Sequence, residues 1–130
     1  MIKLYTDAGL NTNLNLAATS YVIKYNDQII KHVEQQQPLD NHYLEFLALK
    51  LALDDMNRQH INDDILFIHS DSKILTDSID KLYSKHYQAI LDPILESLTK
   101  FPSYFVKHIS DKDNNTAHSL IHQELIKLRK

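Results

Sequence analysis

Three acidic residues of this 130-residue chain are of a type that could bind divalent metal ions. Asp7 ends a first strand-like stretch, Glu45 lies inside a helical pattern, and Asp71 follows the apolar run Ile65-Leu66-Phe67-Ile68. Hard cations such as Mg²⁺ prefer carboxylate oxygens, and two ions about 4 Å apart assist phosphodiester hydrolysis. Metal-assisted hydrolysis of a phosphodiester is therefore the chemistry that this set of acids could perform.

Each of these acids also has an ordinary structural explanation, and 17 acids in the chain allow many chance triplets. Asp7 could simply terminate a strand, and Asp71 could belong to a helix cap. Glu45 carries the stronger argument, because it stands between apolar residues in a helix that is mostly committed to packing. A carboxylate near such an interface needs a cation or a polar partner. His69, within the central strand, is expected to be a hydrogen-bonded core histidine.

The elements that must position these acids follow the order β-β-β-α-β-α-β-α. Alternating or continuous apolar residues predict strands over 2–7, 17–25, 28–36, 65–70 and 104–109. Helical spacing predicts helices that begin after Asp40-Asn41, over about 72–84, from a first turn at Pro93, and over 116–130. Asn26-Asp27 is a two-residue hairpin signal between the second and third strands. Asp7-Ala8-Gly9 is expected to end the first strand.

This order predicts an α/β fold, a five-stranded mixed sheet with helices on both faces, in a single domain over residues 1–130. The central strand is expected to be buried on both faces, because its apolar run has no polar break. Ligand sites in α/β sheets gather at the carboxyl ends of such strands, and Asp71 lies there.

The composition limits the classes of protein that this chain can be. Hydrophobic residues make up 43% and charged residues 24% of the chain, which is an ordinary globular balance. It has no cysteine, which excludes thiolate metal sites, and no apolar run near the ~20 residues of a membrane helix. We expect a soluble cytoplasmic protein. The net charge of −3 argues against indiscriminate coating of nucleic acid but leaves a nuclease open.

Four anchors resemble those of the type 1 ribonuclease H family, in the family's order. They are Tyr5-Thr6-Asp7-Ala8-Gly9, then 40–49 (DNHYLEFLAL), then His69-Ser70-Asp71-Ser72, and finally Val106-Lys107-His108 with 114–120 (NNTAHSL). The resemblance covers essentially the whole chain. It is closest to short bacterial ribonuclease H-like proteins, because no long basic insertion lies between the second and third helices.

The resemblance implies a ribonuclease H-like fold and a site for two Mg²⁺ or Mn²⁺ ions. Asp7 would bridge both ions, while Glu45 and Asp71 would share coordination on one side. His108 matches the mobile-loop histidine that assists product release or proton transfer in the family. His118 occupies the position of the fourth metal-binding acid.

The same resemblance implies an RNA–DNA hybrid as the partner. Asn41 and His42 match positions that contact the RNA strand through the minor groove, where 2′-hydroxyl groups distinguish RNA from DNA. Lys73 matches another position that faces the nucleic acid. A monomer without protein partners is expected.

Two departures from the family pattern affect these expectations. His118 replaces an acid, and imidazole is a weaker partner for Mg²⁺ than for Mn²⁺, so we predict weaker metal affinity and activity that favours Mn²⁺. Asp111 or Asp113 could compensate for the missing acid. The first loop, Asn11-Thr12-Asn13-Leu14-Asn15, replaces the usual glycine- and proline-rich segment, which affects how closely backbone and substrate approach there.

The leading hypothesis is a metal-dependent endonuclease that cuts the RNA strand of RNA–DNA hybrids, leaving a 5′-phosphate and a 3′-hydroxyl. One alternative is a catalytically weak or inactive module that binds hybrid or duplex RNA. A second is a nuclease of the same fold that acts from 3′ ends or on double-stranded RNA, since fold alone does not fix function. A third is a scaffold or partner subunit without a nucleic-acid role.

Overall fold

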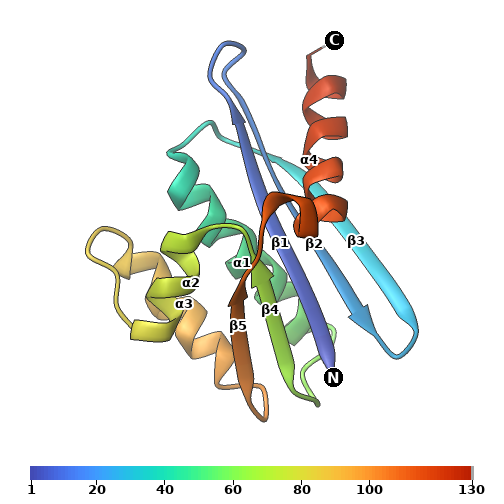
Figure 1. Ribbon diagram of the computed structural model, residues 1–130, viewed down its shortest axis with the longest axis vertical. Helices are drawn as coiled ribbons and strands as arrows, with labels where there is room; N and C mark the ends of the chain where they lie inside the picture. The colour runs from blue at the N-terminus through green and yellow to red at the C-terminus, as the bar shows by residue number, and fades with distance from the viewer. Residues whose placement is uncertain (130) are drawn as a thin grey trace.

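The computed structural model describes residues 1–129, which form a five-stranded sheet and four α-helices (Figure 1). The strands are β1 (Ile2–Asn11), β2 (Leu16–Tyr25), β3 (Gln28–Gln36), β4 (Leu66–Ser70) and β5 (Tyr104–His108). The helices are α1 (Asn41–Arg58), α2 (Lys73–Lys81), α3 (Gln88–Leu98) and α4 (Asn115–Leu128), with a short 3₁₀ turn, η1 (Asp111–Asn114), before α4. The last residue of the expected closing helix, Lys130, lies outside the described residues.

The sheet is mixed, with the strand order β3-β2-β1-β4-β5. β1, β2 and β3 pair antiparallel, whereas β4 pairs parallel with both β1 and β5. Thr6 of β1 lies opposite Ser70 of β4, so the next residues, Asp7 and Asp71, emerge side by side at one edge of the sheet. The predicted α/β class, strand number and element order are confirmed.

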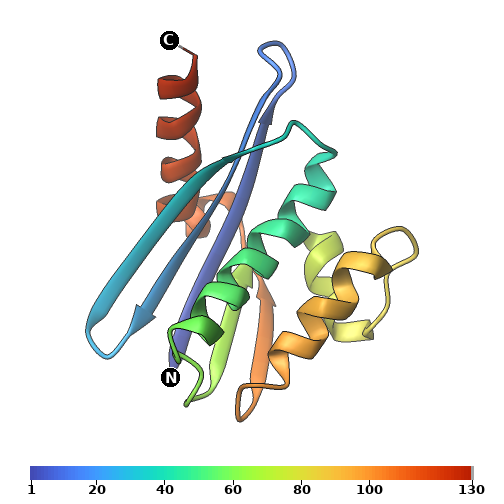
Figure 2. The ribbon, with the colours of Figure 1, turned by 180° about the vertical axis from the view of Figure 1, so that it is seen from behind.

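The two faces of the sheet are covered unequally. α1 packs on β1 and β2, and α2 and α3 pack beside it on the same side (Figure 2). The core lies between these helices and the sheet, where side chains such as Leu4, Phe46, Ile68 and Leu91 are fully buried. The other face carries α4, which packs on β1, β2 and β3 (Figure 1). Within residues 1–129, no helix combines the length and apolar character that crossing a bilayer requires.

The expectation that β4 is buried on both faces is wrong. Leu66, Ile68 and Ser70 are buried under the helices, but Phe67 and His69, which alternate with them, are only half-buried. The reason is that α4 packs over β1–β3 and leaves the β4–β5 side of that face largely uncovered. His69 is hydrogen-bonded as expected, with its Nδ1 3.1 Å from the Leu4 carbonyl oxygen, but it is half-buried and not part of the core.

The expected end of the first strand at residues 7–9 is also wrong. β1 continues to Asn11, because its residues stay paired with β2 as far as the Asn11–Leu16 pair. Gly9 lies within the strand, where a Cβ atom would come within 2.4 Å of Ile121 Cγ2 on α4. The glycine therefore permits close approach of α4 to β1 rather than a turn.

Pro93 lies in the middle of α3, not in its first turn as expected. The helix begins five residues earlier, at Gln88, because Ile90 and Leu91 are buried together with Ile94 and Leu98. Proline inside a helix removes one backbone hydrogen bond, and burial of this apolar stripe outweighs that loss.

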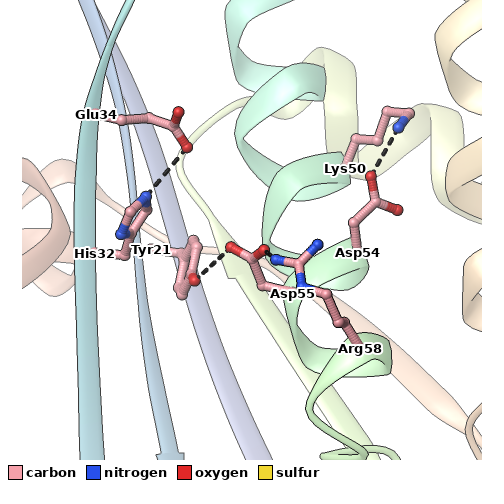
Figure 3. Close-up of polar contacts among 7 residues, drawn as sticks. All are labelled: Tyr21, His32, Glu34, Lys50, Asp54, Asp55 and Arg58. Carbon is pink, nitrogen blue, oxygen red and sulfur yellow. Dashed lines mark hydrogen bonds and ion pairs between the residues drawn. The ribbon is translucent and has the colours of Figure 1, made fainter.

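Turn geometry defines the hairpin, and local polar contacts fix the first helix. Asn26 and Asp27 both have positive φ angles, 50° and 63°, as the predicted two-residue turn requires. The Tyr21 hydroxyl on β2 donates a 2.7 Å hydrogen bond to Asp55 Oδ2 on α1 (Figure 3). At the other end of α1, the Asp40 carboxylate accepts from the Tyr43 backbone N–H at 3.2 Å, as a cap should.

Candidate active site

The structure brings Asp7, Glu45 and Asp71 together. One carboxylate oxygen from each residue lies within 4.8 Å of the others. Asp7 and Asp71 meet because β1 and β4 run parallel in register, and Glu45 joins them from the face of α1 that packs on the sheet. Acids that are 64 residues apart in the sequence therefore form one cluster.

The start of α4 is tied to the sheet next to this cluster. Ser20 Oγ on β2 donates a 2.7 Å hydrogen bond to the Ala117 carbonyl oxygen, and the buried Asn114 Nδ2 donates at 2.8 Å to the Thr6 carbonyl oxygen. These two bonds hold the first turn of α4 against β1 and β2. Consequently His118 lies beside Asp7, with 3.1 Å between its ring Nδ1 and Asp7 Oδ2.

The position of His118 is close to the one that the sequence predicts for a fourth ligand. Its side chain is 59% exposed, whereas Asp7 is buried. In this structure the ring contacts the cluster by hydrogen-bonding Asp7, and the three carboxylates converge without it.

Burial and the mutual repulsion of the carboxylates raise the pKa values of the three acids in the cluster. Burial, followed by the negative charges of Asp7 and Asp71, raises the pKa of Glu45 from its ordinary 4.5 to about 9. Burial and the nearby Asp71 raise the pKa of Asp7 to about 6, although the Ala8 N–H and His118 act in the opposite direction. The pKa of Asp71 is also raised, by burial and by the neighbouring Asp111 carboxyl. Glu45 therefore holds a proton near neutral pH in the metal-free protein.

These residues fit a divalent cation. The three carboxylates supply hard oxygen ligands, and Glu45 Oε1 is buried without any hydrogen-bond partner. A cation among them would replace the proton on Glu45, offset the repulsion and satisfy the unpartnered oxygen. A protein core without such a role rarely keeps three adjacent acids, since burying charge is costly.

The cluster opens into a pocket of about 270 Å³ between the first turns of α1 and α2. Asn41, His42 and Lys73 line it together with Glu45 and Asp71. Asn41 and His42 are the first two residues of α1, and Lys73 is the first residue of α2, so all three are exposed at the mouth. The predicted nucleic-acid contacts thus share one opening with the acids.

Two further predicted residues lie near Asp71. The exposed His108, at the end of β5, has its Nε2 3.2 Å from the Asp71 carbonyl oxygen. Asp111, in η1, is close enough to raise the pKa of Asp71. Asp113 instead lines a separate pocket with Tyr5, so Asp111 is the better placed of the two possible substitutes for the fourth acid.

Sequence reasoning missed Ser20 and Asn114 as residues that position the site. Ser20 carries no signal in the sequence, because its role depends on the pairing of β2 with β1 and on the return of α4. Asn114 lies in a polar stretch that reads as loop, and only its burial at the end of η1 reveals its contact with Thr6.

A family model described as reverse transcriptase-like matches residues 5–123 of the chain. The chain is also similar to a putative hydrolase, EbsB, of Enterococcus faecalis (strain ATCC 700802 / V583). The two are 28% identical over 130 residues, which cover 98% of this chain and 96% of that protein.

Solved structures share the whole fold at low sequence identity. RNase H1 from the halophilic archaeon Halobacterium salinarum NRC-1 superposes with a TM-score of 0.84 at 20% identity, covering 97% of this chain and 98% of that one. LC11-RNase H1, solved in complex with an RNA/DNA hybrid, gives a TM-score of 0.86 at 20% identity, with both chains covered completely.

Proposed function

The chain belongs to the reverse transcriptase-like family, with a ribonuclease H fold, and on this premise we propose that it is a metal-dependent endonuclease cutting the RNA strand of RNA–DNA hybrids. The observation that carries the proposal is the convergence of Asp7, Glu45 and Asp71 within 4.8 Å, beside a pocket that Glu45 and Asp71 line. The hybrid bound by LC11-RNase H1, which shares the fold, supports the choice of substrate.

The carboxylates of the cluster would hold two divalent ions. Asp7, between its neighbours in the sheet and α4, would contact both ions, while Glu45 and Asp71 would share one of them. When bound, Mg²⁺ or Mn²⁺ lowers the pKa of an attacking water and stabilises negative charge on the phosphate oxygens. The protein contributes by keeping the three acids fixed before substrate arrives.

Recognition of the RNA strand would come from the mouth of the pocket. The exposed side chains of Asn41 and His42 can reach 2′-hydroxyl groups, which DNA lacks. Lys73, whose side chain is 74% exposed and whose Nζ lies 3.4 Å from Asp77 Oδ2, remains available to a phosphate. His108, beside Asp71, is suited to moving a proton to or from the leaving oxygen.

The metal preference follows from His118. An imidazole beside Asp7 brings the second ion no negative charge, whereas a carboxylate would bring one, and nitrogen ligands suit Mn²⁺ better than Mg²⁺. We therefore propose that cleavage with Mn²⁺ is faster than with Mg²⁺.

The test is cleavage of a defined, end-labelled RNA–DNA hybrid with Mg²⁺ and Mn²⁺ in parallel. Internal cuts in the RNA strand, with a higher rate in Mn²⁺ at saturating metal, are expected. Asp71→Asn should lower the rate by several orders of magnitude while leaving the circular dichroism spectrum unchanged. The matched control is Asp92→Asn, which removes an exposed acid from α3 and should leave the rate unchanged.

Other products would contradict the proposal in specific ways. A ladder that begins at 3′ ends would indicate an exonuclease, and cutting of duplex RNA in preference to hybrid would indicate a different substrate. Equal rates with both ions at saturation would contradict the Mn²⁺ preference alone.

The contact between His118 and Asp7 favours one second candidate, a binding module with little catalysis. If the ring keeps its hydrogen bond to Asp7, the second ion has an incomplete ligand set. In that case the protein should bind hybrid without cutting it, and His118→Asp should raise cleavage from near zero.

A further inference from the structure

Part of the sheet faces outward without a helix over it. Alternation along the strands puts six side chains on this side: Lys3, Tyr5, Phe67, His69, Phe105 and Lys107. We call them the open face. Lys3, Phe105 and Lys107 are exposed and the other three are half-buried. In Figure 1 the open face lies on β1, β4 and β5, below the turn that leads into α4.

The aromatic rings of the open face form two stacked pairs across neighbouring strands. Phe67 and Phe105 stack with ring centroids 5.2 Å apart, and Tyr5 and His69 with centroids 4.4 Å apart. β5 is the last strand of the sheet, so the outer side of the Phe105 ring, in a residue that is 54% exposed, has no neighbouring strand to cover it. This ring offers a stacking surface at the end of an existing stack.

The charge around the Phe67 and Phe105 rings is positive, although the chain as a whole carries −3 and Asp113 lines a pocket with Tyr5 at the α4 end of the face. Lys3 and Lys107 belong to the face, and Lys24 of β2 extends it, with its Nζ 5.2 Å from the centre of the Tyr5 ring. The next acid along β1 is Asp7, which is buried beside α4. The acid that precedes β4, Asp64, is paired with the N-terminal amine.

Cations beside open aromatic rings are the combination that binds single-stranded nucleic acid, because lysines contact phosphates while bases stack on rings. The Asp and Glu side chains of an acidic polypeptide would use the lysines but would not stack on the Phe105 ring. We propose that the open face is a second nucleic-acid site, separate from the acid cluster, which binds a single strand through base stacking on Phe105 and phosphate contacts to Lys3 and Lys107.

The proposal does not depend on catalysis, so it is tested without it. The Asp71→Asn protein in EDTA is titrated into two fluorescein-labelled twelve-nucleotide strands, oligo-dT and an abasic strand with the same phosphates. We expect oligo-dT to bind roughly 5- to 150-fold more tightly, since one stacked base contributes about 1–3 kcal/mol. Replacing Lys3 and Lys107 together by Gln should reduce the slope of log K against log salt by about 1.4, or about 0.7 per lost contact.

Variants at Phe105 decide whether the binding uses this face. Phe105→Ala should remove the preference for oligo-dT, and Phe105→Leu, which retains apolar bulk, should also remove it if stacking is the cause. A thermal melt establishes that each variant is folded. Tyr83→Ala, which removes a ring that is 59% exposed in the α2–α3 loop, and Lys127→Gln on α4 serve as matched controls and should leave binding unchanged.

Four outcomes would overturn the proposal. The first three are equal affinity for the abasic strand, an unchanged preference in both folded Phe105 variants, and loss of binding in Tyr83→Ala alone. A polyglutamate peptide that binds as tightly as oligo-dT would also overturn it and would indicate a site for acidic proteins. The Phe105→Leu variant with Asp71 intact is also assayed for hybrid cleavage. This assay reports on the acid cluster, separately from binding at the open face.

Discussion

The ring Nδ1 of His118 lies 3.1 Å from Asp7 Oδ2 and joins the last helix, α4, to β1 at the acid cluster. The contact depends on the Ser20 and Asn114 hydrogen bonds that fix the first turn of α4. It connects His118 to Asp7, the acid expected to bind both ions.

Replacing His118 by Asp should strengthen Mg²⁺ binding and reduce the Mn²⁺ preference, because a fourth carboxylate adds a hard ligand and a negative charge. We expect Mg²⁺ affinity, measured by titration calorimetry, to rise at least about tenfold, the scale on which changes around metal ligands act. His122→Asp adds the same charge one turn along α4, away from the cluster, and is the control. Equal effects of the two variants would mean that charge alone, not ligation, is responsible.

Glu45→Gln should stabilise the metal-free protein. The folded pKa of Glu45 is about 9 and the ordinary value is 4.5, so between these values the folded chain holds a proton that the unfolded chain has lost. Stability of the wild type therefore decreases as pH rises through this window, whereas the amide variant does not titrate. In EDTA at pH 8 we expect a gain on the order of 2 kcal/mol, or several degrees in melting temperature.

A control variant and a measurement with added metal accompany this experiment. Glu96→Gln, at an exposed position of α3, should give no change. Adding Mn²⁺ should raise the melting temperature of the wild type more than that of Glu45→Gln, because the variant has lost a ligand. A melting temperature gap between wild type and Glu45→Gln that does not widen from pH 6 to pH 8 would disprove the raised pKa.

Asn114→Ala should lower both stability and activity. The substitution leaves the Thr6 carbonyl oxygen without its side-chain donor and loosens the first turn of α4, at a cost of about 1–3 kcal/mol. We expect a lower urea midpoint and a reduced cleavage rate, since His118 and Asp7 lose their fixed relation. The exposed neighbour variant Asn115→Ala should change neither quantity.

Gly9→Ala should destabilise the protein through a contact with α4. The new methyl group would meet Ile121 Cγ2 at 2.4 Å, and overpacking of this kind costs about 1–3 kcal/mol. Ile121→Ala removes the opposing atom, so the double variant should be more stable than the sum of the two single effects predicts. Additive effects in a double-mutant cycle by urea unfolding would show that the backbone of β1, rather than the contact, is sensitive.

The order of strands and helices was predictable because each element has its own local pattern. Alternation defines the early strands, Asn26-Asp27 has the turn chemistry of a hairpin, and Asp40 caps α1 as expected. The convergence of Asp7, Glu45 and Asp71 was predicted by resemblance, and the parallel register of β1 and β4 explains it.

What the sequence did not reveal depends on contacts between distant segments. Pro93 was assigned to a first turn because its local preference points there, and packing of Ile90 and Leu91 overrides that preference. Gly9 was interpreted as a strand end, because no residue near it in the sequence indicates its close approach to Ile121 on α4. The apolar run of β4 predicts burial on both sides. The residues of β4 do not indicate that α4 covers only β1, β2 and β3 on one of those sides.

The spacing of the site residues has a consequence for synthesis of the protein. Asp7 is made early and His118 late, because α4 follows β5 and η1 in the sequence. A growing chain on the ribosome therefore lacks the contact between His118 and Asp7 until the residues of α4 have emerged. Ribosome-bound chains halted before η1 should cleave no labelled hybrid, whereas the same chains extended beyond α4 by an unstructured linker should cleave it.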